Sequence, residues 1–221
     1  MNTVYSVPLN ACLFEGDINR CLEQLPASVV CALKSRPNKI CVAGGFIRAV
    51  LAKETVKDID IFVDSEQTAR DVAAELRKPG VTNLETGKAI TVLGYTVAPQ
   101  VIYKWLFEHP RDVIEAFDFT IAQASFWWDC DHWTSHIHLD FYPDLQTKTL
   151  VYTDPRDNDD AGTFLRVLKF YRAGYGIDND TLGKVLAGLC RGTSPEALLG
   201  TEEFLAQSFS RRFPHSSNGK Y

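Results

Sequence analysis

Two aspartates that are one residue apart, Asp58 and Asp60, have the type and spacing best suited to chemistry in this chain. They lie in the apolar run of residues 58–63, which is typical of a β-strand, and residues i and i+2 of a strand point to the same face. Both carboxylates therefore project together, while Ile59 and Ile61 face a core. Carboxylates bordering a buried strand need partners, and a divalent cation such as Mg²⁺ or Mn²⁺ supplies one. The pair predicts a metal site for phosphoryl chemistry.

A glycine pair upstream of the aspartates could hold the phosphates of a nucleotide. Gly44 and Gly45 lie between a strand predicted over residues 39–43 and a helix predicted over residues 46–53. Glycine permits a positive φ and a close ligand approach, and the N–H groups of a first helical turn favour an anion. Arg48, one turn into the helix, could bind a phosphate oxygen. For the glycines alone, the alternative is a plain βα turn with an exposed arginine.

Bulk properties limit the class of protein without choosing its function. A chain of 221 residues is long enough for one large domain, or for one domain with a small appendage. The net charge of -5 gives no sequence-wide basic surface for nucleic acid, so an RNA contact would need a local one. No apolar run approaches the roughly 18 residues of a membrane span. The first residues also lack the regions of a signal peptide, so we expect a cytoplasmic protein without membrane contact.

The six cysteines form no CxxC pair, which argues against a zinc ribbon or a thioredoxin-like site. Most have apolar neighbours, as Cys31 and Cys41 do. We therefore expect reduced, buried and unreactive thiols.

The remaining pattern alternates helices and strands. Residues 17–35 read as helices broken near Pro26, and Ser65 is typical of a helix N-cap. A helix is also predicted from Thr193, before a polar tail that starts at Arg211. The other expected elements are a helix over 66–77, β-rich runs over 90–97 and 100–105, a short helix over 110–115, a hairpin of 117–128 and 136–142 joined by a long polar turn, and helical structure from 162 onward.

Three segments of the chain resemble motifs of one protein family and occur in the same order as in that family. The stretch CVAGGFIRAVLAKETVKDIDIFVDS is similar to the head domain of tRNA CCA-adding enzymes and bacterial poly(A) polymerases. Those proteins open with a Gly-Gly-x-x-Arg helix, followed by a basic residue and Asp-x-Asp. Residues 117–124 are similar to the family's Asp-Phe-Thr-Ile-Asn-Ala motif, and residues 159–174 to its helical segment after the head. The resemblance covers roughly residues 38–175.

The resemblance implies a fold and a domain division. The fold would be α+β: a nucleotidyltransferase (polymerase-beta-like) head with a mixed sheet flanked by helices, followed by a small helical C-terminal part. The head would span residues 1–158, including an N-terminal helical segment over 1–37. A short helical extension would span residues 159–221.

The resemblance also implies an activity. A nucleoside monophosphate would pass from a nucleoside triphosphate, such as ATP, to a hydroxyl acceptor, with RNA or tRNA as the expected partner. The implied site residues are the catalytic and metal-binding Asp58 and Asp60, the nucleotide- and phosphate-binding Gly44, Gly45 and Arg48, and Asp118 near the nucleotide's sugar.

Four positions depart from the family pattern: Ala49 follows the motif arginine, Gln100 replaces a third acidic residue, and Phe117 and Thr163 replace arginines. An amide supplies no negative charge for a second metal ion, and neither Phe117 nor Thr163 can read a base edge as a guanidinium does. Little chain follows residue 175 to carry tRNA, so CCA addition itself is not expected. The alternative is a catalytically degenerate nucleotide- or RNA-binding homologue, or a toxin/antitoxin- or phage-type accessory protein.

A second group of polar residues surrounds the predicted hairpin turn. His136 and His138 would share a strand face, with His132 nearby. Metal binding and base stacking among the neighbouring tryptophans are two interpretations. A polar turn with aromatic cover is the third.

Overall fold

The computed structural model describes residues 11–153, 155 and 160–190 of the chain. The chain divides into two compact units, one of Met1–Thr147 with Thr153–Arg156 and one of Lys148–Tyr152 with Asp157–Tyr221. The boundary predicted between residues 158 and 159 lies outside the described residues. So do the helix predicted from Thr193 and the polar tail from Arg211.

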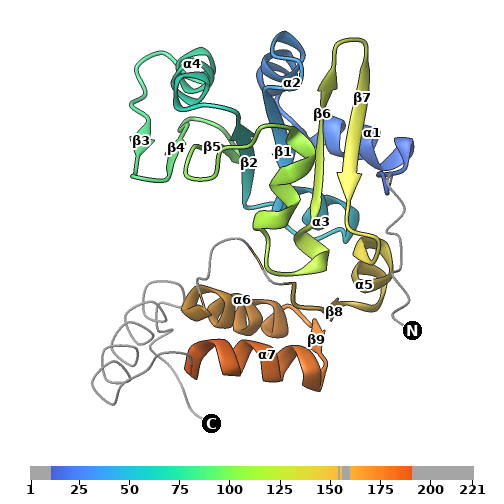
Figure 1. The fold of residues 1–221 in the computed structure, drawn as a ribbon. Coiled ribbons are helices and arrows are strands. Elements are labelled where there is room, and N and C mark those ends of the chain that lie inside the picture. Colours follow the sequence, from blue (N-terminus) through green and yellow to red (C-terminus); the bar gives the residue numbers. More distant parts are fainter. Residues whose placement is uncertain (1–10, 154, 156–159, 191–221) are drawn as a thin grey trace. The chain divides into compact units, whose positions relative to one another are not determined.

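The first unit is built on a mixed seven-stranded sheet (Figure 1) with the strand order β3-β4-β5-β2-β1-β6-β7. Among its pairings, β2 and β5 run parallel and the others are antiparallel. The predicted α+β class is confirmed. The strands are β1 (Ile40–Ala43), β2 (Asp58–Val63), β3 (Leu84–Glu85), β4 (Ala89–Thr91), β5 (Ala98–Ile102), β6 (Ala124–Asp129) and β7 (His132–Ile137).

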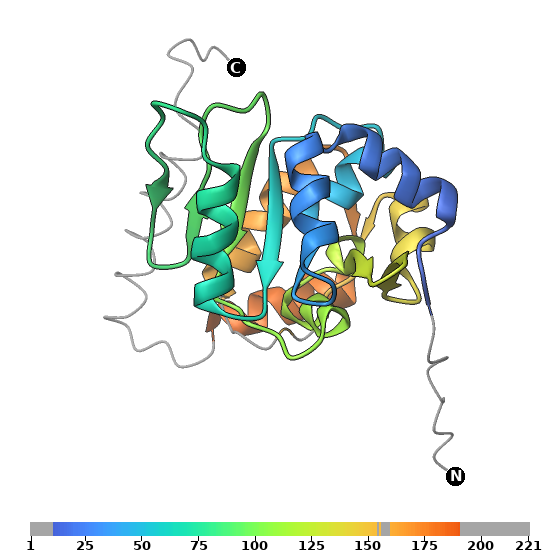
Figure 2. The same ribbon diagram turned by 90° about the horizontal axis from the view of Figure 1, so that it is seen from above.

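Helices cover one face of this sheet, as Figures 1 and 2 show. The predicted break near Pro26 separates the first two, and the Ser65 hydroxyl caps the fourth by accepting from the N–H of Thr68 at 3.1 Å. Apolar residues of all five helices share one core with the inward side chains of the strands. The helices are α1 (Glu15–Gln24), α2 (Ala27–Ser35), α3 (Gly45–Leu51), α4 (Glu66–Leu76) and α5 (Phe141–Thr147).

The other face carries a smaller apolar cluster, covered by the 3-10 helix η1 (Pro110–Ala116) and the loop before it. Side chains alternate between the two sheet faces along β2, and this alternation determines which residues lie on the second face. Ile59, Ile61 and Val63 enter the helix-covered core, whereas Phe62 enters the smaller cluster. Asp58 and Asp60 therefore lie on the same face as Phe62, as the sequence predicts.

The predicted hairpin was wrong in its bounds. β6 and β7 are joined by only two residues, Cys130 and Asp131, because Cys130 adopts a positive φ of 55° that reverses the chain at once. Residues 117–123 form a loop with the short 3-10 helix η2 (Thr120–Ala122), and α5 begins at Phe141. Asp118 therefore lies in a loop, where its position does not follow from strand alternation.

The β-rich runs are shorter than predicted. β4 ends at Thr91, and Gly94, with φ 88°, lies in the turn that leads to β5. β5 ends at Ile102, so Tyr103 and Trp105 lie beyond the sheet.

The prediction that the cysteines are buried holds for two of the six and is wrong for the other four. Cys21 and Cys41 are fully buried, and burial raises the pKa of the Cys21 thiol to about 12. Cys31 is exposed because α2 turns Val29, Ala32 and Leu33 to the core and leaves residue 31 on the outer side. Cys12, Cys130 and Cys190 are exposed as well.

The described part of the second unit is a helical pair with a small parallel sheet. α6 and α7 each carry buried residues, and Leu150 pairs with Ile177 across the sheet. Thr163, 3% exposed, accepts from the Arg166 guanidinium at 3.2 Å. None of the described helices is long and apolar enough to cross a membrane. The elements are β8 (Thr149–Leu150), α6 (Asp160–Arg172), β9 (Gly176–Ile177) and α7 (Asn179–Cys190).

A partly buried polar contact joins α1 to α5, and we expect its loss to destabilise the fold. The Tyr142 hydroxyl donates to Asp17 at 2.6 Å and accepts from the Phe14 N–H at 3.0 Å. Because Asp17 is only 7% exposed, Tyr142→Phe should lower the free energy of unfolding by about 1–3 kcal/mol. Urea unfolding measures this, with the exposed Tyr171→Phe as control. Equal effects of the two substitutions would contradict the assignment.

Candidate functional site

The candidate site centres on Asp58 and Asp60, which are half-buried on the face of β2 opposite the helix-covered core. Two residues along a strand span about 6.6 Å, so both carboxylates can approach a common ligand. Among the described residues, no group of three or more His, Cys, Asp or Glu side chains could hold a metal ion.

Gln100 lies beside the pair. The family resemblance implies a third carboxylate at this position, and this chain has an amide there instead. Gln100 is the pairing partner of Asp60 in the parallel β2–β5 ladder, so their side chains leave the same face of adjacent strands about 4.8 Å apart. Two carboxylates and one amide oxygen are hard oxygen ligands of the kind that Mg²⁺ accepts. Mg²⁺ is commonly held by one or two carboxylates together with substrate phosphates. The residues present therefore fit such an ion.

The glycine turn joins β1 to α3 beside this pair, because β1 is the antiparallel neighbour of β2. Gly44 has φ 76° and ψ −130°, a conformation that requires glycine. Its N–H donates to the Ala124 carbonyl at 2.9 Å, so Gly44 contributes shape rather than a free donor. A Cβ added at Gly45 would meet nothing nearer than the Arg48 guanidinium at 3.9 Å. The space beside Gly45 is open, and an arginine borders it.

Arg48 is held in place by an ion pair that the sequence did not reveal. Its Nε lies 3.4 Å from Oε2 of Glu54, and its side chain is 11% exposed. Glu54 follows α3 at a spacing without helical periodicity, so no local pattern could have identified it. The guanidinium is a positioned cation next to the glycine turn, as the predicted phosphate contact requires.

The loop that carries Asp118 approaches the glycine turn through Phe117. An ideal Cβ on Gly44 would lie 2.7 Å from Cε1 and Cζ of Phe117, so the phenyl ring packs directly on the glycine. Asp118 is 5% exposed, and its carbonyl accepts from the Thr153 N–H at 2.9 Å. The structure thus brings this motif to the glycine turn. The contact of Asp118 with a nucleotide's sugar stays a prediction.

The histidines of the hairpin do not form one group. His132 begins β7 and His138 lies just after its end at Ile137, so the two are about 20 Å apart at 3.3 Å per residue. His132 pairs with Asp131 at 2.5 Å, and the pKa of His136 is lowered by burial and by the nearby Arg111 cation. The predicted metal and stacking roles of these residues stay untested.

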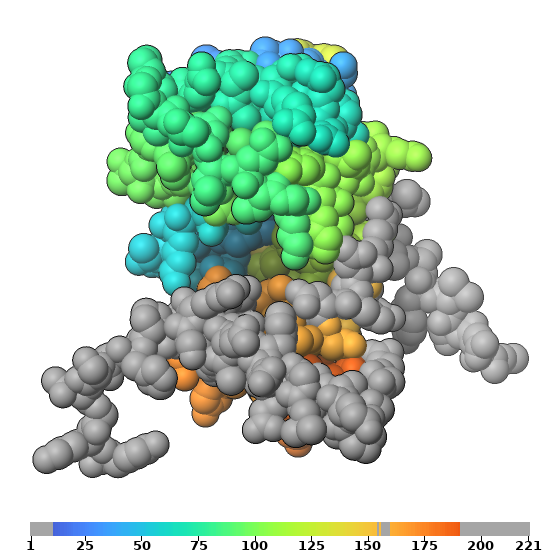
Figure 3. All heavy atoms as spheres, turned by 90° about the vertical axis from the view of Figure 1, so that its left-hand side faces the viewer, coloured from blue at the N-terminus to red at the C-terminus, as the bar shows by residue number. Residues whose placement is uncertain are grey.

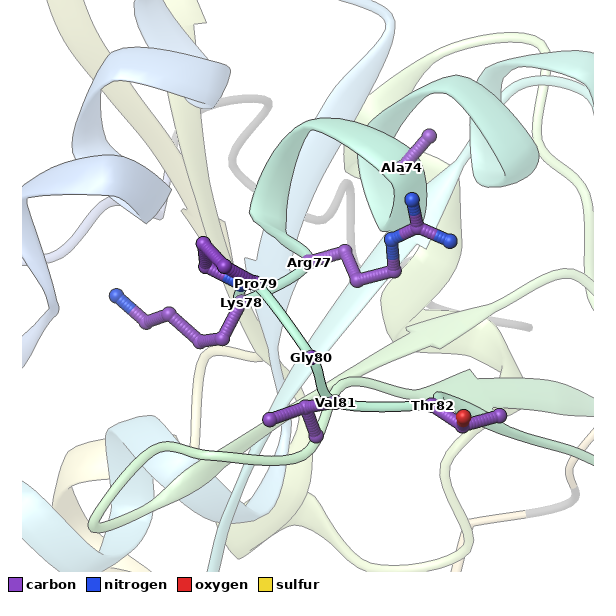
Figure 4. Close-up of a pocket in the computed structure, with 7 residues that line it drawn as sticks. All are labelled: Ala74, Arg77, Lys78, Pro79, Gly80, Val81 and Thr82. Atoms are coloured by element: carbon purple, nitrogen blue, oxygen red, sulfur yellow. The ribbon is translucent and has the colours of Figure 1, made fainter.

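Two cavities lie away from the carboxylates. One of about 600 Å³ lies between the start of α1 and the β6–β7 hairpin, and its lining includes Trp128 and Trp133. Another of about 480 Å³ follows the end of α4 (Figure 4), where the Arg77 and Lys78 side chains point in different directions. Lys78 lies over the Tyr95 ring at 4.4 Å. The surface in Figure 3 shows the side of the molecule where α4 and the β3–β4 edge are exposed.

Comparison with known proteins gives a family match for the first unit. A model described as "Gabija anti-defense 2 family protein" matches residues 14–148. A curated relative, "Gabija anti-defense 2" of Bacillus phage SPbetaL7, is 25% identical over 124 residues. That alignment covers 56% of this chain and 30% of the relative, so the chain spans less than a third of the relative's length.

Solved structures of tRNA-processing enzymes share the fold. A Thermotoga maritima CCA-adding enzyme complexed with tRNA has a TM-score of 0.56 at 16% identity, over 91% of this chain and 56% of that one. A CCA-adding enzyme with ATP has a TM-score of 0.59 at 19% identity, over the same shares. Another with CTP reaches 0.60 at 16% identity, over 86% and 49%. The predicted resemblance to a nucleotidyltransferase head is confirmed, and at these identities the likeness is one of fold.

Proposed function

This chain belongs to the Gabija anti-defense 2 family, and we propose that it acts as a phage-type anti-defence protein by metal-dependent nucleotidyl transfer. The proposed reaction moves a nucleoside monophosphate from a nucleoside triphosphate to a hydroxyl, with RNA as the acceptor. One observation carries the proposal. Two half-buried carboxylates, Asp58 and Asp60, share one sheet face beside a glycine turn that a positioned arginine borders.

Each residue has a defined task in the proposed reaction. Asp58 and Asp60 would hold Mg²⁺ or Mn²⁺, with the Gln100 amide oxygen alongside. When bound, the ion polarises the phosphate and lowers the pKa of the attacking hydroxyl. The Gly45 N–H and the Arg48 guanidinium would bind the β- and γ-phosphates.

The proposed transfer forms one bond at the α-phosphorus and breaks another. The acceptor oxygen forms a bond to the α-phosphorus, and the bond from the α-phosphorus to the oxygen that bridges the β-phosphate breaks. The proton of the hydroxyl passes to solvent, and pyrophosphate leaves with the electron pair of the broken bond. Arg48 would stabilise the negative charge that develops on this leaving group, because a fixed cation there needs no reorganisation.

A labelling screen tests the proposal. The full chain is incubated with Mg²⁺ and each of the four α-labelled nucleoside triphosphates, against cellular RNA and cellular protein in separate reactions. We expect label in the RNA fraction with the wild-type chain and none with Asp58→Asn. Label only in the protein fraction would overturn RNA as acceptor, and label in neither fraction from folded protein would overturn the enzyme.

Gln100 favours a second candidate, a homologue that binds nucleotide without turnover. The amide beside Asp60 leaves the face with two negative charges where relatives are expected to carry three. Such a protein would bind nucleoside triphosphate with Mg²⁺ but release no pyrophosphate.

Gln100→Glu separates the two candidates. The added carboxylate should lower the Mg²⁺ concentration for half-maximal transfer about tenfold, because cation affinity follows the number of ligand charges. A Mg²⁺ titration of pyrophosphate release measures this, with the exposed Gln24→Glu as matched control. An unchanged Mg²⁺ requirement would contradict the placement of Gln100 in the metal site. Release by the variant alone would favour the binding-only wild type.

A further inference from the structure

Phe117 is a partly buried aromatic residue at the site, and the proposed reaction assigns it no role. Its ring edge packs on Gly44, with Cε1 and Cζ each 2.7 Å from the position of an added Cβ. The same ring meets Phe62 edge to face, with centroids 5.6 Å apart and an interplanar angle of 80°. Phe62 lies two residues from Asp60 on the same strand face. The ring is therefore next to both the glycine turn and the carboxylate strand.

Two hydrogen bonds to its carbonyl hold the backbone of Phe117 in place. Its carbonyl accepts from Nε2 of Gln123 at 3.0 Å and from the Thr153 hydroxyl at 2.9 Å. Gln123 is 5% exposed, so a buried side chain holds the backbone here, while the ring itself is held by its contacts with Gly44 and Phe62. A partly exposed ring with a fixed backbone loses little conformational entropy when a flat ligand lies on it.

We propose that Phe117 is the surface on which the nucleotide's base stacks, and that it makes the site accept any of the four bases. This inference rests on the proposed function, because it assigns the substrate specificity of that site. A phenyl ring has no donor or acceptor with which to read a base edge, whereas every base has a π-face that can stack. The arginine that the family resemblance implies at this position would instead offer a directed fork of N–H donors.

Binding measurements without an acceptor test the inference, because no transfer can then occur. Calorimetry with Ca²⁺ gives the Kd of ATP, CTP, GTP, UTP and inorganic tripolyphosphate, which has phosphates but no base. The variants are Phe117→Leu, which keeps apolar packing on Gly44 and Phe62, and Phe117→Trp, which enlarges the stacking surface. Phe14→Leu, at a residue that is 69% exposed on the N-cap of α1, is the matched control.

The wild-type chain should bind the four nucleotides within about threefold of one another, since stacking is tolerant of base identity. Phe117→Leu should weaken all four by about tenfold and leave tripolyphosphate within about twofold, because only the stacking contribution is lost. Phe117→Trp should keep or improve nucleotide affinity, and Phe14→Leu should change nothing.

Three results would overturn the inference. Nucleotide affinities of a folded Phe117→Leu that match the wild type would exclude stacking on Phe117 and leave the proposed function standing. One nucleotide preferred by more than about twentyfold would exclude a base-tolerant site. No binding of any nucleotide to the wild-type chain would overturn the inference and the proposed function together.

Discussion

Asp58→Asn should abolish nucleotidyl transfer, with a loss of about 10³-fold or more. The substitution preserves shape but removes one of two charges that hold the metal ion, and that ion contributes several kcal/mol to transition-state stabilisation. Each factor of ten in rate corresponds to about 1.4 kcal/mol. Asp60→Asn should have an effect of similar size, because both carboxylates lie on one strand face. Single-turnover incorporation of labelled nucleotide measures both losses.

Asp71→Asn is the matched control, since Asp71 is exposed on α4 on the opposite side of the sheet. A second measurement separates lost chemistry from lost folding. Without metal, the two like charges on one strand face repel each other, so Asp58→Asn should not lower the melting temperature of the metal-free chain. Transfer by Asp58→Asn within tenfold of the wild-type rate would refute the assigned role of this carboxylate.

Gly44→Ala should have the largest effect on stability at the site. The residue would have to keep φ at 76°, at a backbone cost of about 1–3 kcal/mol. Its new methyl group would also overlap the Phe117 ring, which adds about 1–3 kcal/mol of overpacking unless the ring moves. We therefore expect a lower free energy of unfolding and a loss of nucleotide binding, as measured by urea unfolding and calorimetry.

Gly80→Ala is a control that separates the backbone cost of a positive φ from the cost of overlap with the Phe117 ring. Gly80 also has a positive φ, 74°, but an added Cβ there meets nothing within 4 Å. The excess cost of Gly44→Ala over Gly80→Ala is the overlap with Phe117. The double variant Gly44→Ala with Phe117→Ala should remove that excess. Equal costs of the two glycine substitutions would mean that the ring does not pack on Gly44.

Local patterns predicted the parts of the site that lie within single elements. The alternation of Ile59, Asp60 and Ile61 placed the carboxylates on one face, and apolar flanks identified the strand itself. The glycines placed the turn between β1 and α3. The position of Gln100 came from the family resemblance and not from a local pattern, and the structure pairs it with Asp60 although the two residues are 40 positions apart in the chain.

Contacts between distant segments were beyond prediction. Nothing in the local sequence indicates that the Phe117 ring packs on Gly44, because this contact depends on the path of a loop more than 70 residues further along the chain. The pair of Arg48 and Glu54 is closer in sequence, but it depends on the turn that the chain takes after α3. The hairpin failed for a related reason. Residues 117–128 are mostly apolar and largely buried, and burial in a loop with a 3-10 turn gives the same pattern as burial in a strand.

The fate of the two ends of the nucleoside triphosphate tests the central claim most directly. The wild-type chain is given acceptor RNA with Mg²⁺ and ATP labelled either at the α- or at the γ-phosphate. Nucleotidyl transfer predicts that the α-label enters the RNA, while the γ-label leaves in pyrophosphate. Label from the γ-phosphate in the RNA, or its release as free phosphate without any α-label in the RNA, would contradict the account.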